Sequence, residues 1–171
     1  MRLSRINLLL GATVLLMAVF AGFSLIPDET SAVTRLTKQD PRSLRHIRID
    51  RGDGNVLAFE RNLTGWRMTI PYNRIANPDK LHAVVRIAAA PSHRRFAVED
   101  TDPAELGFSP PPVHLQLDGE LLEIGGTEPI RRRRYVRIGE WVHLIDDLFQ
   151  HHLLAVPETF VQSPQAGRNT D

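Results

Sequence analysis

The sequence of 171 residues contains no cysteine. Disulfide bonds, thiolate metal sites and a cysteine nucleophile are therefore excluded for this chain. An excess of charge is also missing, because 21 basic residues balance 20 acidic ones and leave a net charge of +1. Nucleic-acid-binding proteins usually carry a broad basic field, so this balance argues against a nucleic-acid partner.

The short motifs of several enzyme classes are absent as well. The chain has no GxGxxG or GxxxxGKS/T phosphate loop, no HExxH zinc motif, and no GxSxG or SxxK nucleophile motif. The adjacent pair His151 and His152 does not predict a metal site, because neighbouring residues of a helix point about 100° apart. We therefore expect no metal and no cofactor, and the sequence names no reaction.

One long uncharged run is present, from Ile6 to Ile26. A helix of about 21 residues spans roughly 31 Å, close to the hydrocarbon thickness of a bilayer. Arg2 and Arg5 precede the run and acidic residues follow it, so the positive-inside rule predicts a cytoplasmic segment 1–5 and a transmembrane anchor 6–26. The body of the chain is then expected in the periplasm, held at a bacterial inner membrane by a single span.

Two other interpretations of this run remain open. A cleaved signal peptide is one, with Val19-Phe20-Ala21 as a weak cleavage site inside the apolar run, and a buried helix of a soluble protein is the other. Beyond the run, the polar segment 27–43 is expected to be a tether. Residues 44–161 then form one domain, and residues 162–171 form a disordered tail.

Alternation of apolar and polar residues predicts that this domain is rich in strands. Connections in its first part are too short for parallel crossovers, which favours an antiparallel meander. Asp118-Gly119 and Gly139-Glu140 predict hairpin turns in the second part, whereas Gly125-Gly126 is expected to interrupt a strand. The expected strands are 45–50, 56–61, 66–70, 94–98, 113–117, 122–124, 134–138 and 141–145.

One amphipathic helix is expected between the two sets of strands. Asn77 is a typical N-cap and Pro78 a typical first helical residue. An apolar stripe follows at helical spacing and predicts packing on the sheet, facing Trp66, Met68 and Ile70. The stripe consists of Leu81, Val84, Val85 and Ala88. The predicted fold class is α+β, mainly antiparallel sheet with one principal amphipathic helix, preceded by an N-terminal transmembrane helix.

Further short elements are expected around the acidic residues. The segment 102–107 predicts a helical turn that ends at Gly107, and Asp146 is expected to cap a last short helix that runs to Leu154. Capping also accounts for Glu99, Asp100 and Asp147 without invoking paired catalytic carboxylates.

Several short motifs, in this order, resemble the domain-of-unknown-function 4340 family of bacterial envelope proteins. Gly65-Trp66, Pro71 and Ala76 lead into the helix, Gly107-Phe108 is followed by Pro110–Pro112, and Gly125-Gly126 is followed by Arg134-Tyr135-Val136. The resemblance covers residues 36–160 and corresponds to a single-unit version, since no second copy is found. It implies an anchored extracytoplasmic domain. Some relatives are encoded beside transporter components of the gliding-motility type, and the family brings no established catalytic residues.

Arg131, Arg132, Arg133 and Arg134, followed by Tyr135, form the one marked charge cluster. Protection of an edge strand by solvated charges is one interpretation. Binding of an acidic protein loop or a lipid phosphate by guanidinium groups beside an aromatic ring is another, and it makes these five residues the candidate binding site. A nucleic-acid groove is the least favoured of the three.

Together these features predict a membrane-anchored extracytoplasmic accessory or interaction module without enzymatic activity, associated with a transporter or an envelope complex through a protein partner. The oligomeric state is left open. The alternative is a periplasmic, hydrolase-like enzyme whose site is assembled only in three dimensions. Ser92-His93 with Asp100 and Asp102 suggests a nucleophile, a base and an orienting acid for that alternative.

Overall fold

A computed structural model of the chain describes residues 34–162. The predicted cytoplasmic segment 1–5, the predicted anchor 6–26 and the predicted disordered tail beyond Gln162 lie outside the described residues. No helix among the described residues is long and apolar enough to cross a membrane.

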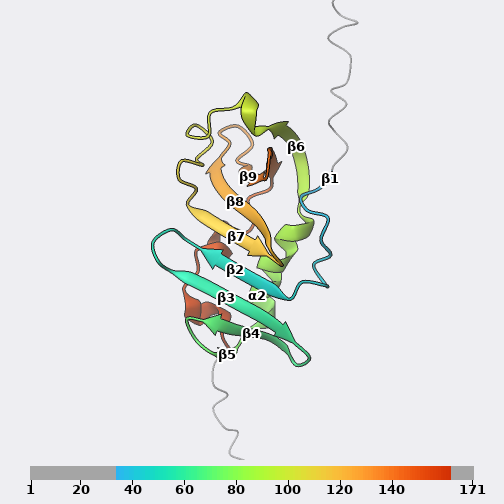
Figure 1. Cartoon of the computed structure of the whole chain (residues 1–171), viewed down its shortest axis with the longest axis vertical. Helices are drawn as coiled ribbons and strands as arrows, with labels where there is room; N and C mark the ends of the chain where they lie inside the picture. The colour runs from blue at the N-terminus through green and yellow to red at the C-terminus, as the bar shows by residue number, and fades with distance from the viewer. Residues whose placement is uncertain (1–33, 163–171) are drawn as a thin grey trace, which may run out of the picture. The chain divides into compact units, whose positions relative to one another are not determined.

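Within residues 34–162, ten strands form one antiparallel sheet in the order β1-β6-β10-β9-β8-β7-β2-β3-β4-β5 (Figure 1). Two meanders, β2-β3-β4-β5 and β7-β8-β9-β10, lie side by side and are joined by pairing of β2 with β7. The strands are β1 (Thr34–Arg35), β2 (His46–Asp50), β3 (Val56–Asn62), β4 (Gly65–Ile70), β5 (Arg74–Ile75), β6 (Pro91–Ala97), β7 (Val113–Leu117), β8 (Glu120–Thr127), β9 (Arg134–Ile138) and β10 (Trp141–Ile145). The mainly antiparallel α+β class is confirmed.

The predicted hairpins form where the turn residues indicate. At the β7–β8 turn, Asp118 and Gly119 have φ angles of 44° and 93°, a left-handed pair that matches the right-handed twist of the two strands. The sequence suggests that Gly125-Gly126 interrupts a strand. In the structure β8 instead runs on through both glycines to Thr127, with a register shift. A Cβ at Gly125 would lie 2.6 Å from the Leu106 carbonyl oxygen and 2.7 Å from the Phe108 ring, so glycine is required there by close packing.

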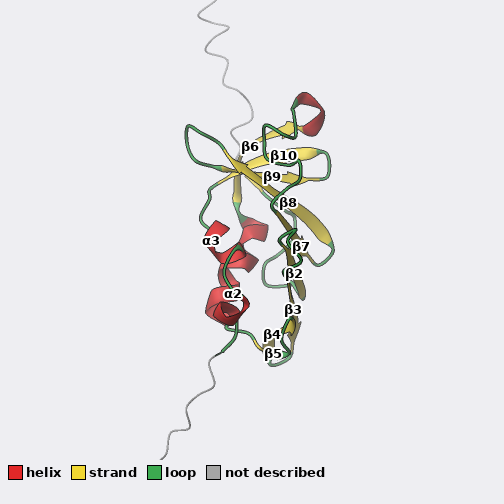
Figure 2. Ribbon diagram, turned by 90° about the vertical axis from the view of Figure 1, so that its left-hand side faces the viewer, coloured by secondary structure: helices red, strands yellow, loops and turns green. Residues whose placement is uncertain are grey.

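The helix α2 (Pro78–Val85) connects the two meanders. Asn77 caps it by accepting from the Asp79 N–H at 3.0 Å, and the chain continues as a 3₁₀ turn, η1 (Arg86–Ala89). Leu81, Val84 and Val85 are buried as the stripe predicts. Figure 2 shows α2 and the short helix α3 (Gln150–Leu153) on the same face of the sheet. The opposite face of β7, β2, β3 and β4 carries no helix of residues 34–162, and we call it the helix-free face.

The core lies between this helical layer and the sheet. Phe160, from the 3₁₀ turn η3 (Pro157–Phe160), is fully buried and meets Phe59 edge to face with ring centroids 5.5 Å apart. Met68 of β4 is fully buried, but Trp66 is half-buried and Ile70 is 41% exposed. A register shift between Ala58 and Phe59 places Ile70 opposite Ala58, and so the expected three-residue stripe does not form.

The folded region begins earlier than the sequence suggests. Thr34 and Arg35, inside the predicted tether 27–43, pair with β6 as β1. Leu36 and Thr37 are then buried, and the Thr37 hydroxyl donates to the Ala88 carbonyl at 2.9 Å. A two-residue strand is too short to show alternation, which is why a sequence pattern does not reveal it.

Near the C-terminal end, α3 starts at Gln150 and Asp146 does not cap it. The residue at its N-cap is Phe149, whose side chain makes no cap hydrogen bond and is buried in the core instead. The predicted turn over 102–107 does form and ends at Gly107, where φ is 77°.

Candidate functional site

The predicted arginine site lies in the connection between β8 and β9. Arg131 is the last residue of a turn, and β9 begins only at Arg134. Because β9 pairs with both β8 and β10, it is an interior strand, and protection of an edge strand does not explain these charges.

Arg134 is directed into the protein. Its side chain is 6% exposed and donates to the Gly125 carbonyl at 2.8 Å, to the Asp147 carboxylate and to the Gln150 side-chain oxygen. These bonds tie β9 to the segment that leads into α3. A buried guanidinium with this many internal acceptors has a structural role, and it is removed from any surface that a partner contacts.

The other three arginines are more exposed than Arg134. The Nε atom of Arg133 lies 3.6 Å from an Asp146 oxygen, which is also 3.0 Å from Nε2 of His93. Arg131 and Arg132 are exposed, and neither side chain forms an ion pair within residues 34–162. Two guanidinium groups of the predicted site are therefore accessible to an external anion.

Tyr135 extends this region toward β6. Its ring meets the ring of Phe96 edge to face at 6.5 Å. Burial, together with nearby Glu128, raises the pKa of the Tyr135 phenol, so the hydroxyl stays protonated and able to donate at neutral pH. The predicted binding role of this residue and of the three outer arginines stays a prediction.

The serine and histidine residues meet in an arrangement that the sequence does not suggest. Ser92 is paired with His143 of β10, with Oγ 2.9 Å from Nδ1, and His93 faces Asp146 instead. Ser92 and His143 are 3% and 7% exposed, and burial with nearby Arg95 lowers the pKa of His143 to about 4. The imidazole is therefore neutral at pH 7, but no carboxylate among the described residues orients it.

No group of three acidic or histidine residues within the described range is placed to hold a metal ion. The rings of His151 and His152 lie 3.9 Å apart at the surface. Desolvation and the neighbouring His151 lower the pKa of His152.

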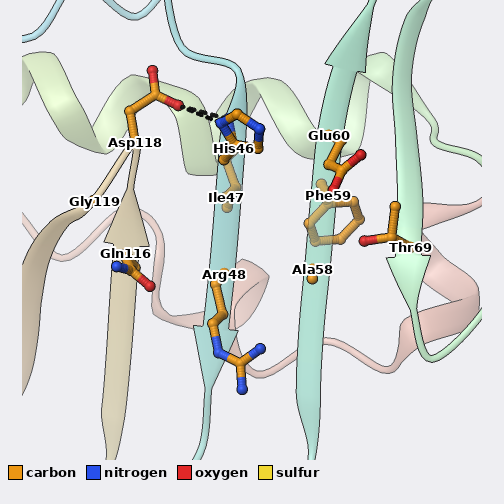
Figure 3. Close-up of a pocket in the computed structure, with 10 residues that line it drawn as sticks. All are labelled: His46, Ile47, Arg48, Ala58, Phe59, Glu60, Thr69, Gln116, Asp118 and Gly119. Carbon is orange, nitrogen blue, oxygen red and sulfur yellow. Dashed lines mark hydrogen bonds and ion pairs between the residues drawn. The ribbon is translucent and has the colours of Figure 1, made fainter.

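The helix-free face of the sheet carries an open hollow of about 220 Å³ (Figure 3). Exposed polar side chains from three neighbouring strands surround it, Arg48 from β2, Glu60 from β3 and Gln116 from β7. At its rim the Asp118 carboxylate accepts from the N–H groups of Arg45 and His46, at 2.9 and 2.6 Å. Arg48 makes no ion pair within the described part of the chain.

Sequence reasoning does not find this face, because its residues come from strands that are distant in the sequence and become neighbours only through the pairing of β2 with β7. The sequence does show the polar residues that alternate with apolar ones along each strand, but this pattern indicates only that they are exposed to solvent. Arg94 and Arg95 form a further charge pair, at the start of the predicted strand 94–98.

No protein-family model, curated protein or solved structure matches the chain. The resemblance to the domain-of-unknown-function 4340 family therefore stays a prediction from the sequence motifs.

Proposed function

We propose that this chain is a membrane-anchored extracytoplasmic accessory module that binds a partner protein of the bacterial envelope. The observation that carries the proposal is the division of the sheet, within residues 34–162, into a face covered by α2 and α3 and a face without helices (Figure 2). A broad, shallow and polar strand surface suits a protein partner better than an enclosed small-molecule site.

Charge and exposure on the helix-free face support this proposal. Arg48, Glu60 and Gln116 are exposed around the hollow, and Leu121 of β8 is 48% exposed. Arginine and apolar side chains close together are typical of protein interfaces. The anchor predicted over residues 6–26 would hold this surface at the bilayer, so that the module and its partner are confined to the same membrane. Association with a transporter or another envelope complex is part of the proposal through the family resemblance.

Photo-crosslinking in cells tests the proposal. A photoreactive amino acid is placed at Arg48 or Gln116 on the helix-free face, and at Arg86 on the exposed side of the helical layer as the matched control. We expect one discrete envelope protein to be crosslinked from both sheet positions and not from Arg86. Equal adducts from all three positions would contradict a specific interface.

The predicted membrane topology is tested in the same cells. The full-length protein should remain in the membrane after carbonate washing, and its body should be cleaved by protease added from the periplasmic side. Recovery of a soluble form that starts near Gly22 would replace the anchor with a cleaved signal peptide.

A second candidate is a hydrolase that uses Ser92 as nucleophile and His143 as base, which their 2.9 Å contact favours. Burial of both side chains argues against it, because a substrate has no access to the hydroxyl without rearrangement. Covalent labelling of Ser92 by a fluorophosphonate probe would favour the hydrolase over the binding module.

A further inference from the structure

The loop between β8 and β9 is closed on itself by two hydrogen bonds. The Glu128 N–H donates to the Arg133 carbonyl at 2.7 Å, and the Glu128 carboxylate accepts from the Arg131 N–H at 2.8 Å. Residues 129–132, which lie between the two ends of this loop, are all exposed. Three arginines and one glutamate give residues 128–133 a net charge of +2.

A second loop lies against the first. The segment 146–149 follows β10, whose last residue pairs with Arg134. Arg134 donates to the Asp147 carboxylate, and the Nε atom of Arg133 lies 3.6 Å from an Asp146 oxygen. These contacts hold the two loops together at the end of the sheet where β9 begins and β10 ends.

Both loops present a large aliphatic side chain to solvent. Ile130 is 86% exposed and Leu148 is 76% exposed. Beside Ile130, the side chains of Arg131 and Arg132 are exposed, and neither forms an ion pair within residues 34–162. We call the side chains of Ile130, Arg131, Arg132 and Leu148 the exposed tip.

The combination of side chains in the exposed tip suits the surface of an anionic bilayer. An aliphatic group gains free energy when it leaves water for the boundary between headgroups and acyl chains, while a nearby guanidinium stays at the level of the phosphates. Guanidinium groups bind phosphate oxygens through two N–H groups at once. An acidic protein segment would satisfy the two arginines but would leave the two aliphatic side chains in water.

We propose that the exposed tip docks on the surface of an anionic bilayer, with its aliphatic side chains in the interface and its guanidinium groups on lipid phosphates. This inference rests on the membrane anchor of the proposed function. The segment 27–33, which separates the predicted anchor from Thr34, spans at most about 25 Å at full extension, so an anchored domain stays close to the bilayer. Docking of the exposed tip would then determine how the helix-free face is presented to a partner.

Fluorescence of the full-length chain in lipid nanodiscs tests the proposal. Because the chain contains no cysteine, Leu148→Cys provides a single site for the polarity-sensitive dye NBD. The nanodiscs contain phosphatidylcholine alone or phosphatidylcholine with phosphatidylglycerol, each with a nitroxide-labelled lipid as quencher. We expect blue-shifted and more strongly quenched emission in the anionic nanodiscs, and its loss at high salt, because salt screens the charge attraction. The dye at Leu63→Cys, in the exposed β3–β4 turn at the other end of the strands, is the control and should stay in water.

Variants of the labelled chain separate the charge from the apolar contact. Arg131→Gln with Arg132→Gln should shift the docking equilibrium about thirtyfold toward the free loop, because two arginines near an anionic surface are lost. Ile130→Ser should shift it about tenfold, and both changes should leave the melting temperature unchanged. Arg42→Gln with Arg45→Gln removes the same charge from exposed positions just before β2, at the other end of the strands, and is the matched control.

Two results would overturn docking of the exposed tip. One is an unquenched dye at Leu148→Cys in anionic nanodiscs, and the other is equal quenching in the chain with both Arg131→Gln and Arg132→Gln. Displacement of the dye by excess inorganic phosphate at constant ionic strength would likewise overturn the bilayer as the ligand, because a free ion offers no apolar phase.

A chain that does not enter nanodiscs would contradict the anchor rather than the exposed tip. Flotation with phosphatidylglycerol vesicles then decides the proposal for the exposed tip. Flotation that is lost in the double arginine variant supports it, and the absence of flotation overturns it. The crosslinking test at Arg48 and Gln116 is independent of these results, so the failure of one proposal is distinguishable from the failure of the other.

Discussion

Arg131 and Arg134 are three positions apart, yet their environments are opposite. Arg134 bonds Gly125, Asp147 and Gln150 inside the protein, whereas the Arg131 side chain is exposed. Arg134→Gln leaves the Asp147 carboxylate, 16% exposed, without its cation, and we expect a loss of about 3 kcal/mol in the free energy of unfolding. Urea denaturation measures this loss, and Arg131→Gln is the control, with a change below about 0.5 kcal/mol.

Equal stability of the two variants would contradict a structural role for Arg134. It would also return the whole cluster to the candidate binding surface.

His143 makes stability depend on pH. Burial, with Arg95 nearby, lowers the pKa of its imidazole from 6.5 to about 4 in the folded chain. Between these values the unfolded chain binds a proton that the folded chain does not, so the free energy of unfolding falls as pH drops from 6.5 toward 4. The difference corresponds to about 3 kcal/mol at about 1.36 kcal/mol per pH unit.

The variant His143→Gln removes this titration. Its unfolding free energy, measured by chemical denaturation at pH 7 and at pH 4.5, should fall less than that of the natural chain. Exposed His82→Gln is the control and should retain the natural pH dependence. Parallel curves for all three proteins would show that His143 is not the group responsible.

At the scale of the element, β4 shows that two residues on one face of a strand can differ in burial. Met68 lies opposite Phe59 and is fully buried, whereas Trp66 is half-buried beneath the guanidinium of Arg61. We expect Met68→Ala to cost about 3 kcal/mol and Trp66→Ala about 1–2 kcal/mol, the reverse of the order of side-chain size. Thermal or urea unfolding of the two variants checks this order, and a larger loss for Trp66→Ala would place the indole in the core.

Most elements of this fold could be predicted because their signals are local. Alternation located β2, β3, β7, β9 and β10, and Asn77-Pro78 located the start of α2. The end of β8 was not predicted, since the need for glycine at Gly125 comes from Phe108 packing across it. Such a contact leaves no periodic trace in the sequence.

At the scale of the whole molecule, the order of the strands is what sequence reasoning did not supply. Pairing of β2 with β7, and of β6 with β10, joins segments separated by dozens of residues. These pairings create the helix-free face, and they bring Ser92 to His143. The candidate site therefore depends on pairing between strands that are distant in the sequence. Of the predicted site residues, Arg134 is the one that bonds inside the protein.

The position of Phe160 has a consequence for how the protein is made. The ribosome releases the first meander early, but Phe59 lacks its aromatic neighbour, and the Ile75 carbonyl of β5 lacks its bond from the Gln162 N–H, until the last turn of the domain has been synthesised. Completion of the native state is thus deferred to the end of translation. Under the membrane topology proposed above, this delay would keep the chain unfolded while its N-terminal segment enters an export channel.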